Sequence, residues 1–266
     1  MSSNYWCDSM IRKGVRFFHA INLGAFTRYC EAGALLSREL LLRDHSCTPF
    51  WSDDSDGERG VLGRVFGNLY DFGAIYARAQ KSVPNIYGPI AMLFSSGVFQ
   101  EMDDVVVTRN SIAVLQGPWR SHAIDDHNEI DTILSGDECS NHIHSGPPKK
   151  YEYVELSCSN VSLSFSCFSR IIVDDLQIEG RSLLELVREI INAHNVQVIV
   201  QARQYSQGGN LRQLQKVVRA LHSSPAENVN MPSWVTARGQ QSFLKWMKYF
   251  QEDTIEFLRR DSQSGG

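Results

Sequence analysis

The apolar residues of this 266-residue chain occur in short runs that suit buried strands rather than membrane-spanning helices. No run approaches the roughly 18 residues that a helix needs to cross a bilayer, so we expect no membrane partner. Val105–Val107 has no polar alternation, which predicts a strand over 104–108 that is buried on both faces. Residues 15–23, Ile90–Phe94 and Val196–Val200 are further strand candidates. The chain therefore needs a sheet that other elements cover.

Helical periodicity dominates the second half of the chain. Ser182–Ala193 carries its apolar residues on one face, Ser182 can cap the first turn, and Glu185 takes the capping-box position. Apolar stripes at helical spacing recur over Leu211–Leu221 and Ser242–Leu258. Together with the strand candidates, these helices predict an α+β fold.

The remaining segments are assigned from their polarity and glycine content. A helix from Leu23 is expected to stop at Gly33, before a short second turn of helix. We expect three more short strands, the last two of which continue the sheet: Ala113–Leu115, Val161–Phe165 and Arg170–Val173. We expect surface loops over 44–60, over 61–81 with a short helix at its end, and over 120–150.

The net charge of -4 and the pI near 6.1 exclude a protein that mainly coats nucleic acid nonspecifically, because that task requires a strongly basic face. A local basic cleft is compatible with both values. Basic residues near the N-terminus and over 203–219 could bind phosphates or simply form solvated faces. The scattered cysteines lack a C-x-x-C pair and residues 1–10 lack a signal peptide, which predicts a cytoplasmic location.

The segment Tyr151–Cys158 is a predicted strand with carboxylates in its middle. Residues two apart share a face of a strand, so Tyr153 and Glu155 point one way and Glu152 points the other way. A glutamate on a half-buried strand is costly unless it has partners. Glu155 is therefore our candidate catalytic carboxylate, with Tyr153 beside it. An edge-strand glutamate that faces water is the alternative interpretation.

Residues Phe17–Leu23 place His19 at the end of a strand and Asn22 in the polar turn that follows, before a helix and the sequence Gly33–Leu36. In this order the segment resembles the opening of DarT-like ADP-ribosyltransferases. In that family the histidine and neighbouring backbone groups help to hold the nicotinamide and ribose of NAD. The resemblance makes His19 and Asn22 NAD-binding candidates. A core histidine that caps its own strand is the alternative.

A second motif, Asn85–Phe94, places Tyr87 ahead of a Met-Leu strand, as in the same family. An aromatic ring here could stack on nicotinamide, a contact worth about 1 kcal/mol. Packing in a turn is an equally good reason for this tyrosine. The family usually carries an arginine in this stretch that contacts the NAD phosphates, and this segment has none. Three arginines elsewhere could substitute, and we take Arg38 as the candidate ahead of Arg64 and Arg78.

The strand with Glu155 resembles the late strand of the same family, in which a catalytic glutamate precedes an apolar run. With His19 and Tyr87, the chain looks closest to the His-Tyr-Glu variant of the ADP-ribosyltransferase superfamily. The resemblance covers about residues 15–200. It implies a split β-sheet core with flanking helices, NAD as substrate, and transfer of ADP-ribose to a DNA or RNA base. It also implies a toxin, of a toxin–antitoxin or phage-defence system, with an antitoxin protein as partner.

We therefore expect an ADP-ribosyltransferase-like domain over 1–205 and a helical C-terminal extension over 206–266 that could bind the antitoxin. Two other function classes stay open. The missing arginine favours a catalytically silent fold that binds nucleotide, RNA or a partner protein. The acidic, histidine-rich segment 120–150 could instead serve a nuclease. Cys139 and His142 within it have zinc-ligand spacing, but without a second close pair we predict no metal site.

Overall fold

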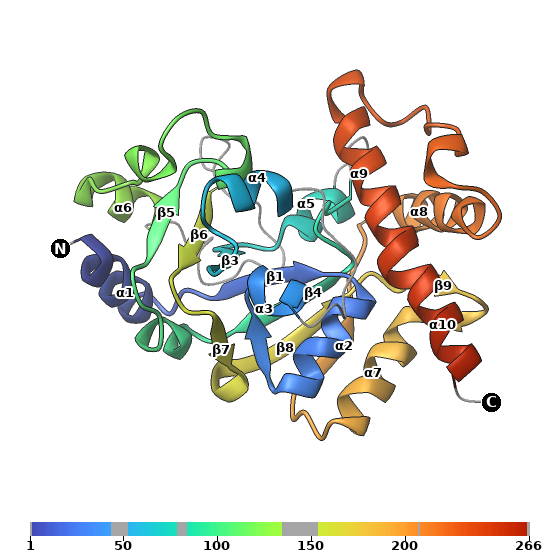
Figure 1. Cartoon of the computed structure of the whole chain (residues 1–266), viewed down its shortest axis with the longest axis horizontal. Coiled ribbons are helices and arrows are strands. Elements are labelled where there is room, and N and C mark those ends of the chain that lie inside the picture. Colours follow the sequence, from blue (N-terminus) through green and yellow to red (C-terminus); the bar gives the residue numbers. More distant parts are fainter. Residues whose placement is uncertain (1, 44–52, 79–83, 135–153, 207, 265–266) are drawn as a thin grey trace. The chain divides into compact units, whose positions relative to one another are not determined.

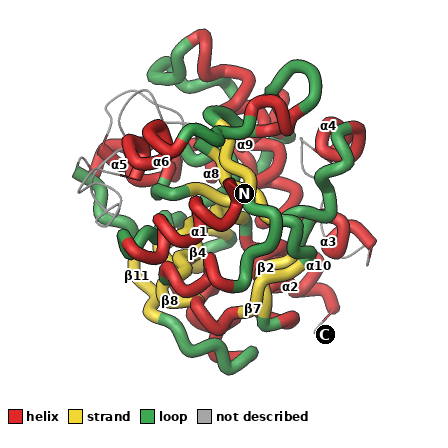
Figure 2. The backbone as a smooth tube through the Cα atoms, turned by 90° about the vertical axis from the view of Figure 1, so that its left-hand side faces the viewer, coloured by secondary structure: helices red, strands yellow, loops and turns green. Residues whose placement is uncertain are grey.

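The computed structural model of the chain describes residues 2–43, 53–78, 84–134, 154–206 and 208–264 (Figure 1). Helices and strands are interspersed along this range, so the fold is α+β, as predicted (Figure 2). The strands are β1 (Phe17–Ile21), β2 (Ala34–Leu36), β3 (Val65–Asn68), β4 (Ile90–Phe94), β5 (Val106–Thr108), β6 (Glu155–Cys158), β7 (Ser162–Ser164), β8 (Phe168–Val173), β9 (Gln177–Ile178), β10 (Arg181–Ser182) and β11 (Ile199–Ala202). The α-helices are α1 (Ser2–Arg12), α2 (Leu23–Ala32), α3 (Arg38–Arg43), α4 (Asp53–Glu58), α5 (Phe72–Arg78), α6 (His127–Leu134), α7 (Leu183–Ala193), α8 (Gly208–Leu221), α9 (Gln240–Phe250) and α10 (Glu256–Ser264).

The first of two compact units contains Met1–His19, Ala32–Asp71 and Leu93–Ser169. Its strands pair in the order β1-β3-β6-β5, and every pair in this series is antiparallel. β6 therefore lies between two neighbours, and all four of its residues are buried. This position confirms the predicted strand over its described part and excludes an edge-strand location for it.

Helices α1 and α6 pack against each other within the first unit. The Tyr5 ring stacks on His127 with the ring centroids 3.8 Å apart, and its hydroxyl donates to Asp131 at 3.0 Å. α6 occupies part of the segment that we expected to be a surface loop over 120–150. That expectation is wrong for these residues because three apolar side chains at helical spacing are buried on α6: Ile130, Ile133 and Leu134.

A separate two-stranded sheet pairs β2 with β7, and Leu35 lies opposite Leu163 in it. The expectation that Val161–Phe165 continues the main sheet is therefore wrong. The short helix expected after Gly33 is present as α3, but β2 separates it from the glycine. Gly33 has a φ of 62°, which ends α2, and the chain extends through β2 before α3 begins.

Two expected loops contain regular elements. The polar segment 44–60 forms α4 in its described part, where acidic residues of the first turn suit the positive end of a helix. The segment 61–81 ends in α5 as predicted but also contains β3, whose Gly67 conceals the strand signal. A Cβ on Gly67 would collide with the Phe17 ring, so only glycine fits there. The strand expected at Ala113–Leu115 is instead a 3-10 turn, Ile112–Val114.

The second unit contains Ala20–Glu31, Phe72–Met92 and Arg170–Gly266. Its strands follow the order β11-β8-β4, and β11 is parallel to β8. α7 is the crossover helix that a parallel pair requires. The Ser182 hydroxyl oxygen accepts a hydrogen bond from the Glu185 amide at 3.2 Å, which confirms the predicted cap.

The helical stripes predicted for the C-terminal part of the chain are confirmed. α8 buries Leu214, Val217, Val218 and Leu221. The rings of Trp234, Phe243, Trp246 and Phe250 follow one another with centroids 5.1, 5.4 and 5.3 Å apart. A π-helical turn, Gln251–Ile255, joins α9 to α10 in one continuous run (Figure 1). None of the helices in the described ranges combines the length and the apolar character needed to span a bilayer.

Candidate active site

Glu155 begins β6 opposite Asn68 of β3 and Thr108 of β5. Directly opposed residues of antiparallel strands point to the same face, so three polar side chains gather there. Their residues are 7, 9 and 1 % exposed, respectively. The Asn68 side-chain amide donates to the Val154 carbonyl at 3.1 Å, and the Thr108 hydroxyl donates to the Asn110 carbonyl at 2.7 Å. The Glu155 carboxylate thus lies in a buried row of polar side chains. The other two, Asn68 and Thr108, are held by hydrogen bonds to backbone carbonyls.

Hydrogen bonds hold the Glu155 carboxylate, and no described residue forms an ion pair with it. Its Oε1 accepts from the Ile112 amide at 2.7 Å. Burial raises the pKa of Glu155 to about 7, hydrogen bonds from Ile112 and Ser111 oppose this rise, and the charge of Asp56 adds to it. A carboxyl group that titrates near neutral pH can serve either as an anion or in proton transfer.

The amide of Ile112 is held in place by an apolar cluster. Ile112 packs with Val61 and Leu115, and Phe66 and Trp119 cover the cluster. The Ile112 residue is 1 % exposed, so the 3-10 turn that it begins is anchored in the core of the first unit. The donor that meets Glu155 is therefore part of a fixed backbone rather than of a mobile side chain.

His19 lies on β1 with its Nδ1 2.8 Å from the Phe66 carbonyl oxygen. A carbonyl can only accept, so Nδ1 carries the proton and Nε2 of the neutral ring is an acceptor. Burial lowers the pKa of His19 to about 4; the bond to Phe66 raises it, and the charge of Arg38 lowers it further. The ring is therefore neutral at pH 7. Its predicted contact with NAD stays a prediction.

Arg38 forms a two-pronged ion pair with Asp53 in the first unit. Its Nε donates to Oδ1 at 2.9 Å and its Nη2 donates to Oδ2 at 2.7 Å. The two side chains are 13 and 10 % exposed, so this bidentate pair is largely shielded from water. A phosphate that binds Arg38 would have to share the guanidinium with Asp53 or displace it.

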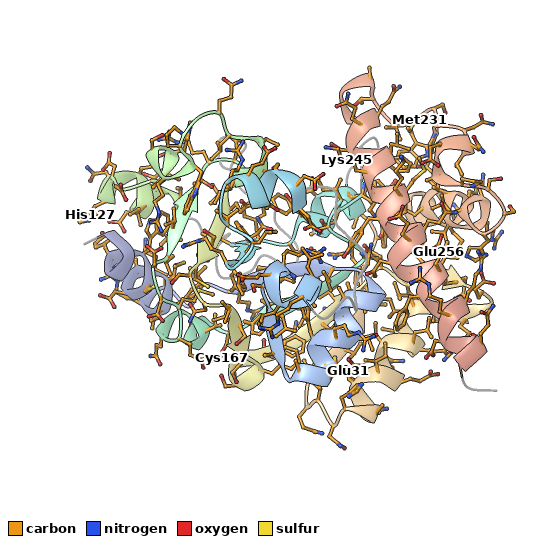
Figure 3. All side chains as sticks on the ribbon, viewed as in Figure 1. Glu31, His127, Cys167, Met231, Lys245 and Glu256 are labelled. Carbon is orange, nitrogen blue, oxygen red and sulfur yellow. The ribbon has the colours of Figure 1, made fainter. Side chains whose placement is uncertain are left out.

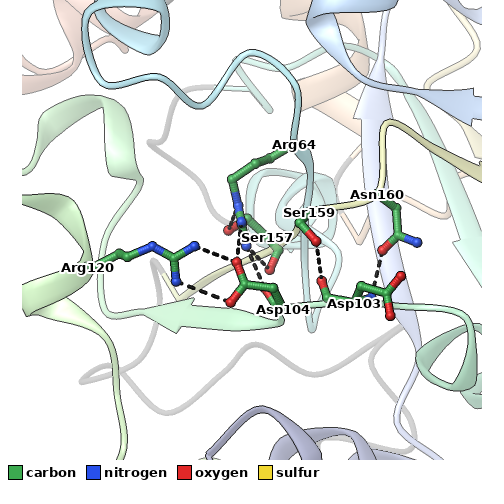
Figure 4. A network of polar contacts seen from close by, with 7 residues as sticks. All are labelled: Arg64, Asp103, Asp104, Arg120, Ser157, Ser159 and Asn160. Carbon is green, nitrogen blue, oxygen red and sulfur yellow. Dashed lines mark hydrogen bonds and ion pairs between the residues drawn. The ribbon is translucent and has the colours of Figure 1, made fainter.

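Arg64, the second arginine considered, belongs to a structural network (Figure 4). It donates to the Ser157 hydroxyl at 3.1 Å and to the Asp104 carboxylate at 2.7 Å, and its guanidinium lies 5.1 Å from the centre of the Trp119 ring. The hydrogen bond from Arg120 and the contacts with Arg64 hold the pKa of Asp104 at about 2, although burial opposes this. Arg64 is thus engaged in joining strands and loops. The side chain of Arg78 lies outside the described residues.

Asn22 and Tyr87 belong to neighbouring backbone segments of the second unit. Gly88 has a φ of 132° and packs so closely on the backbone of Ile21 and Asn22 that a Cβ would overlap with it. Tyr87 precedes this glycine and lies with its ring centroid 6.3 Å from that of Phe72. The Asn22 side chain is fully buried, and neither atom of its amide has a hydrogen-bond partner among the described residues. Such an orphaned amide is costly, which makes it a candidate for ligand contact.

Two features singled out in the sequence lie outside the described residues: Tyr153, with its predicted role beside Glu155, and the pair Cys139 and His142. Within the described ranges, no group of three histidine, cysteine or carboxylate residues is arranged to hold a metal ion. Sequence reasoning missed Asp56, Asn68 and the Ile112 amide. Recognition of β3 would have pointed to Asn68, whereas a backbone donor leaves no trace in the side-chain pattern.

No protein-family model matches the chain, and no curated protein matches it. Among solved structures, the chain is similar to DarT of Thermus sp. 2.9 in complex with NAD+. The two sequences are 13 % identical, and the TM-score is 0.42. The match covers 72 % of this chain and 98 % of that chain.

Proposed function

We propose that the protein is an NAD-dependent mono-ADP-ribosyltransferase that modifies nucleic-acid bases, with Glu155 as its catalytic carboxylate. The environment of this carboxylate carries the proposal. Glu155 is buried, is held by the Ile112 amide, and lacks a counter-ion within the described ranges. Burying a carboxylate without a cation is costly, and groups with such strongly shifted pKa values cluster at functional sites. NAD is proposed as the substrate because the sequence motifs within 15–200 resemble those of NAD-consuming ADP-ribosyltransferases.

In the proposed reaction, the bond between nicotinamide and C1′ of its ribose breaks, and nicotinamide leaves with the bonding electron pair. Positive charge develops on C1′ and on the ribose ring oxygen, and the Glu155 carboxylate stabilises this charge. A nitrogen of the acceptor base then forms a bond to C1′ and loses a proton to the carboxylate or to water. A single anionic group thus supports bond cleavage and the following attack.

The other predicted residues receive roles that suit their chemistry. The orphaned amide of Asn22 can both donate to and accept from the nicotinamide carboxamide, and the Tyr87 ring can stack on nicotinamide. Nε2 of neutral His19 can accept from a ribose hydroxyl. Tyr153 is proposed to lie beside Glu155, and Arg38 to reach a phosphate while Asp53 shares its guanidinium. These four contacts with NAD and the place of Tyr153 are parts of the proposal.

Charge segregation supports nucleic acid as the acceptor. Residues 190–226 contain no aspartate or glutamate, although the whole chain has a net charge of -4. On α8 the exposed side chains of Arg212, Lys216 and Arg219 recur at helical spacing, without an ion pair among the described residues. A row of unpaired cations attracts the phosphates of a nucleic-acid strand.

To test the proposal, the protein is incubated with NAD labelled in its adenylate half and with single-stranded DNA, duplex DNA or RNA. Transfer of the label to the nucleic acid is then measured. We expect the wild type to label at least one of them with release of nicotinamide, and Glu155→Gln to lower the rate by about a hundredfold or more. Glu101→Gln is the matched control, because it neutralises an exposed carboxylate of the same unit. Absence of both label and nicotinamide release with the wild type would contradict the enzyme function.

The pH dependence of the rate tests the role of Glu155 separately. Because charge stabilisation needs the ionised carboxylate and the pKa of Glu155 is about 7, the kcat/KM for NAD should rise with pH about a midpoint near 7. Steady-state rates between pH 5 and 9 measure this midpoint. A rate that is already maximal at pH 5 would show that Glu155 is not the titrating carboxylate.

A catalytically silent fold that binds nucleotide, RNA or a partner protein is the second candidate. The Arg38–Asp53 ion pair favours it, because the arginine expected to meet the NAD phosphates is already neutralised. Calorimetric binding of NAD or RNA by the wild type, without nicotinamide release, would support this candidate.

We propose further that the enzyme acts as a toxin that a protein antitoxin neutralises, the role that the sequence resemblance implies. Induced expression of the wild type in bacteria should then stop growth, whereas Glu155→Gln should not. Equal growth of both strains at equal protein levels would remove the toxin role.

A further inference from the structure

The first turn of α2 directly follows Asn22, the residue whose side-chain amide has no partner within the described ranges. Phe26 donates its amide to the Asn22 carbonyl at 3.0 Å, which makes Asn22 the N-cap residue of this helix. An asparagine at an N-cap ordinarily turns its own side-chain oxygen toward the amides of the second and third helical residues. Those residues in α2 are Gly24 and Ala25.

The C-terminal extension satisfies these amides in place of Asn22. The Asp253 carboxylate accepts from the Gly24 amide at 2.8 Å and from the Ala25 amide at 3.3 Å. The Thr254 hydroxyl lies 3.4 Å from the Leu23 amide. Asp253 and Thr254 are 2 and 0 % exposed, so these contacts are shielded from water. A carboxylate at this end of a helix also complements its positive dipole.

The π-helical turn Gln251–Ile255 brings Asp253 to this position. The turn lies within the run between Lys245 and Glu256, both labelled in Figure 3. Gln251 anchors it, because its Nε2 donates to the Leu221 carbonyl at 2.7 Å and its Oε1 accepts from the Ala226 amide at 2.9 Å. Extra residues in a helical turn re-aim the side chains that it carries, and such turns occur often at functional sites.

Glycine at position 24 lets the extension approach. A Cβ there would lie 2.8 Å from the Asp253 carbonyl oxygen, closer than real side chains pack, and 3.0 Å from a carboxylate oxygen of the same residue. Because the backbones of the two segments meet so closely, the Asp253 carboxylate can reach the amides of both Gly24 and Ala25. The Asn22 side chain is thereby relieved of the capping role that its position would otherwise give it.

We propose that Asp253 is a positioning residue for NAD: it caps α2 in place of Asn22 and so keeps the Asn22 amide available to the nicotinamide carboxamide. This inference rests on the proposed function for the ligand, but the exchange of caps is a property of the protein alone. Removal of Asp253 lets Asn22 turn back to cap its own helix. NAD then has to compete with the helix for the same amide.

The first measurement needs no NAD. In protein with 15N-labelled asparagine, the side-chain signals of Asn22 are assigned by their loss in Asn22→Ala. We expect these signals to shift in Asp253→Ala and to remain close to the wild-type position in Asp253→Asn, whose side-chain oxygen can still accept. Unshifted Asn22 signals in Asp253→Ala would overturn the exchange of caps.

The second measurement is the dissociation constant for NAD from calorimetry. Asp253→Ala should raise the dissociation constant about fivefold, which corresponds to the free energy of one capping interaction. In the Asn22→Ala background, the same change should have no further effect on the dissociation constant. Ser182→Ala is the matched control, since it removes the side-chain cap of α7 in the same unit and should leave NAD binding unchanged. Equal NAD affinity of Asp253→Ala and the wild type would overturn the inference and leave the proposed function standing.

Gly24→Ala approaches the same contact from its other side. The added methyl group should push Asp253 away without changing its charge, so this variant should reproduce the Asn22 shift and the weaker NAD binding. It keeps the test decisive if Asp253→Ala does not fold. A wild type that binds no NAD, with Asn22 signals that still shift in either variant, would reject the proposed function while supporting the exchange of caps.

Discussion

The two units bury carboxylates in opposite ways. In the second unit, Asp174 accepts from the Arg203 guanidinium at 2.6 Å and from the Tyr205 hydroxyl at 2.7 Å, and the ion-paired side chains are 5 and 4 % exposed. In the first unit, Glu155 is also buried, but its carboxylate accepts from a backbone amide and experiences the charge of Asp56. A carboxylate buried with its counter-ion is neutralised within the fold, whereas one buried without it is poised for a charge that a substrate brings.

Removal of the Asp174 carboxylate should have the largest effect on stability. We expect Asp174→Ala to lower the free energy of unfolding by about 3–5 kcal/mol, because Arg203 then keeps a buried charge without its counter-ion. Urea denaturation at pH 7 measures this loss. The double change Asp174→Ala with Arg203→Met should recover much of it, since no buried charge is left. A loss below about 1 kcal/mol for the single change would show that this pair is not structural.

Removal of the Glu155 charge should act in the opposite direction. The folded pKa of about 7 lies above the ordinary 4.5, so the folded protein binds more protons between these values and loses stability as pH rises through them. Glu155→Gln carries no such charge. It should therefore be more stable than the wild type by about 3 kcal/mol at pH 8, and equally stable at pH 4. Urea denaturation at both pH values checks this difference, and a less stable variant at pH 8 would contradict it.

His19 provides an internal control for that measurement. Its folded pKa of about 4 lies below the ordinary 6.5, so the unfolded chain binds more protons in this window and stability falls as pH falls through it. In the wild type the slopes from His19 and Glu155 offset each other between pH 4.5 and 6.5. In Glu155→Gln the His19 slope should emerge as a rise in stability from pH 4 to 6.5. A flat profile in this variant would show that His19 is not buried in its neutral form.

The same contrast explains which elements could be predicted from the sequence. In the second unit, the Ser182 cap and the apolar stripe of α8 agree with the structure because local preference and burial favour the same helix. In the first unit, β3 was missed because Gly67 and Asn68 are poor strand formers. Pairing with β6 and close packing on Phe17 place that strand, and neither is visible in the local sequence.

In the candidate site, too, some features are visible in the local sequence and others depend on tertiary contacts. Glu155 could be selected from strand alternation, but its surroundings could not, because the Ile112 amide lies 43 residues away in the chain and has no side-chain signature. Asp253 is more remote still, 229 residues from the Gly24 amide that it caps. Local patterns identify which group is reactive, whereas its charge state and orientation depend on contacts that only the tertiary fold creates.

The two units also differ in whether their exposed cations are ion-paired, and we expect this difference to have a smaller effect. In the first unit, Arg109 pairs with Glu129 and Arg120 pairs with Asp104. On α8 in the second unit, Arg212, Lys216 and Arg219 are exposed without an ion pair in the described part of the chain. Paired cations gain little from a phosphate because a carboxylate already neutralises them, so the row on α8 should dominate binding of nucleic acid.

Neutralising the row on α8 should therefore weaken binding of single-stranded nucleic acid without affecting NAD cleavage. We expect the triple change to glutamine to lower affinity by roughly tenfold and to reduce the slope of log affinity against log salt by about 2, since each phosphate contact contributes about 0.7. Fluorescence anisotropy across a salt series measures both. The matched control replaces Arg181, Arg259 and Arg260, which are ion-paired cations of the same unit, and should lower affinity far less. Equal losses in the two triple variants would mean that net charge, rather than the row on α8, attracts the strand.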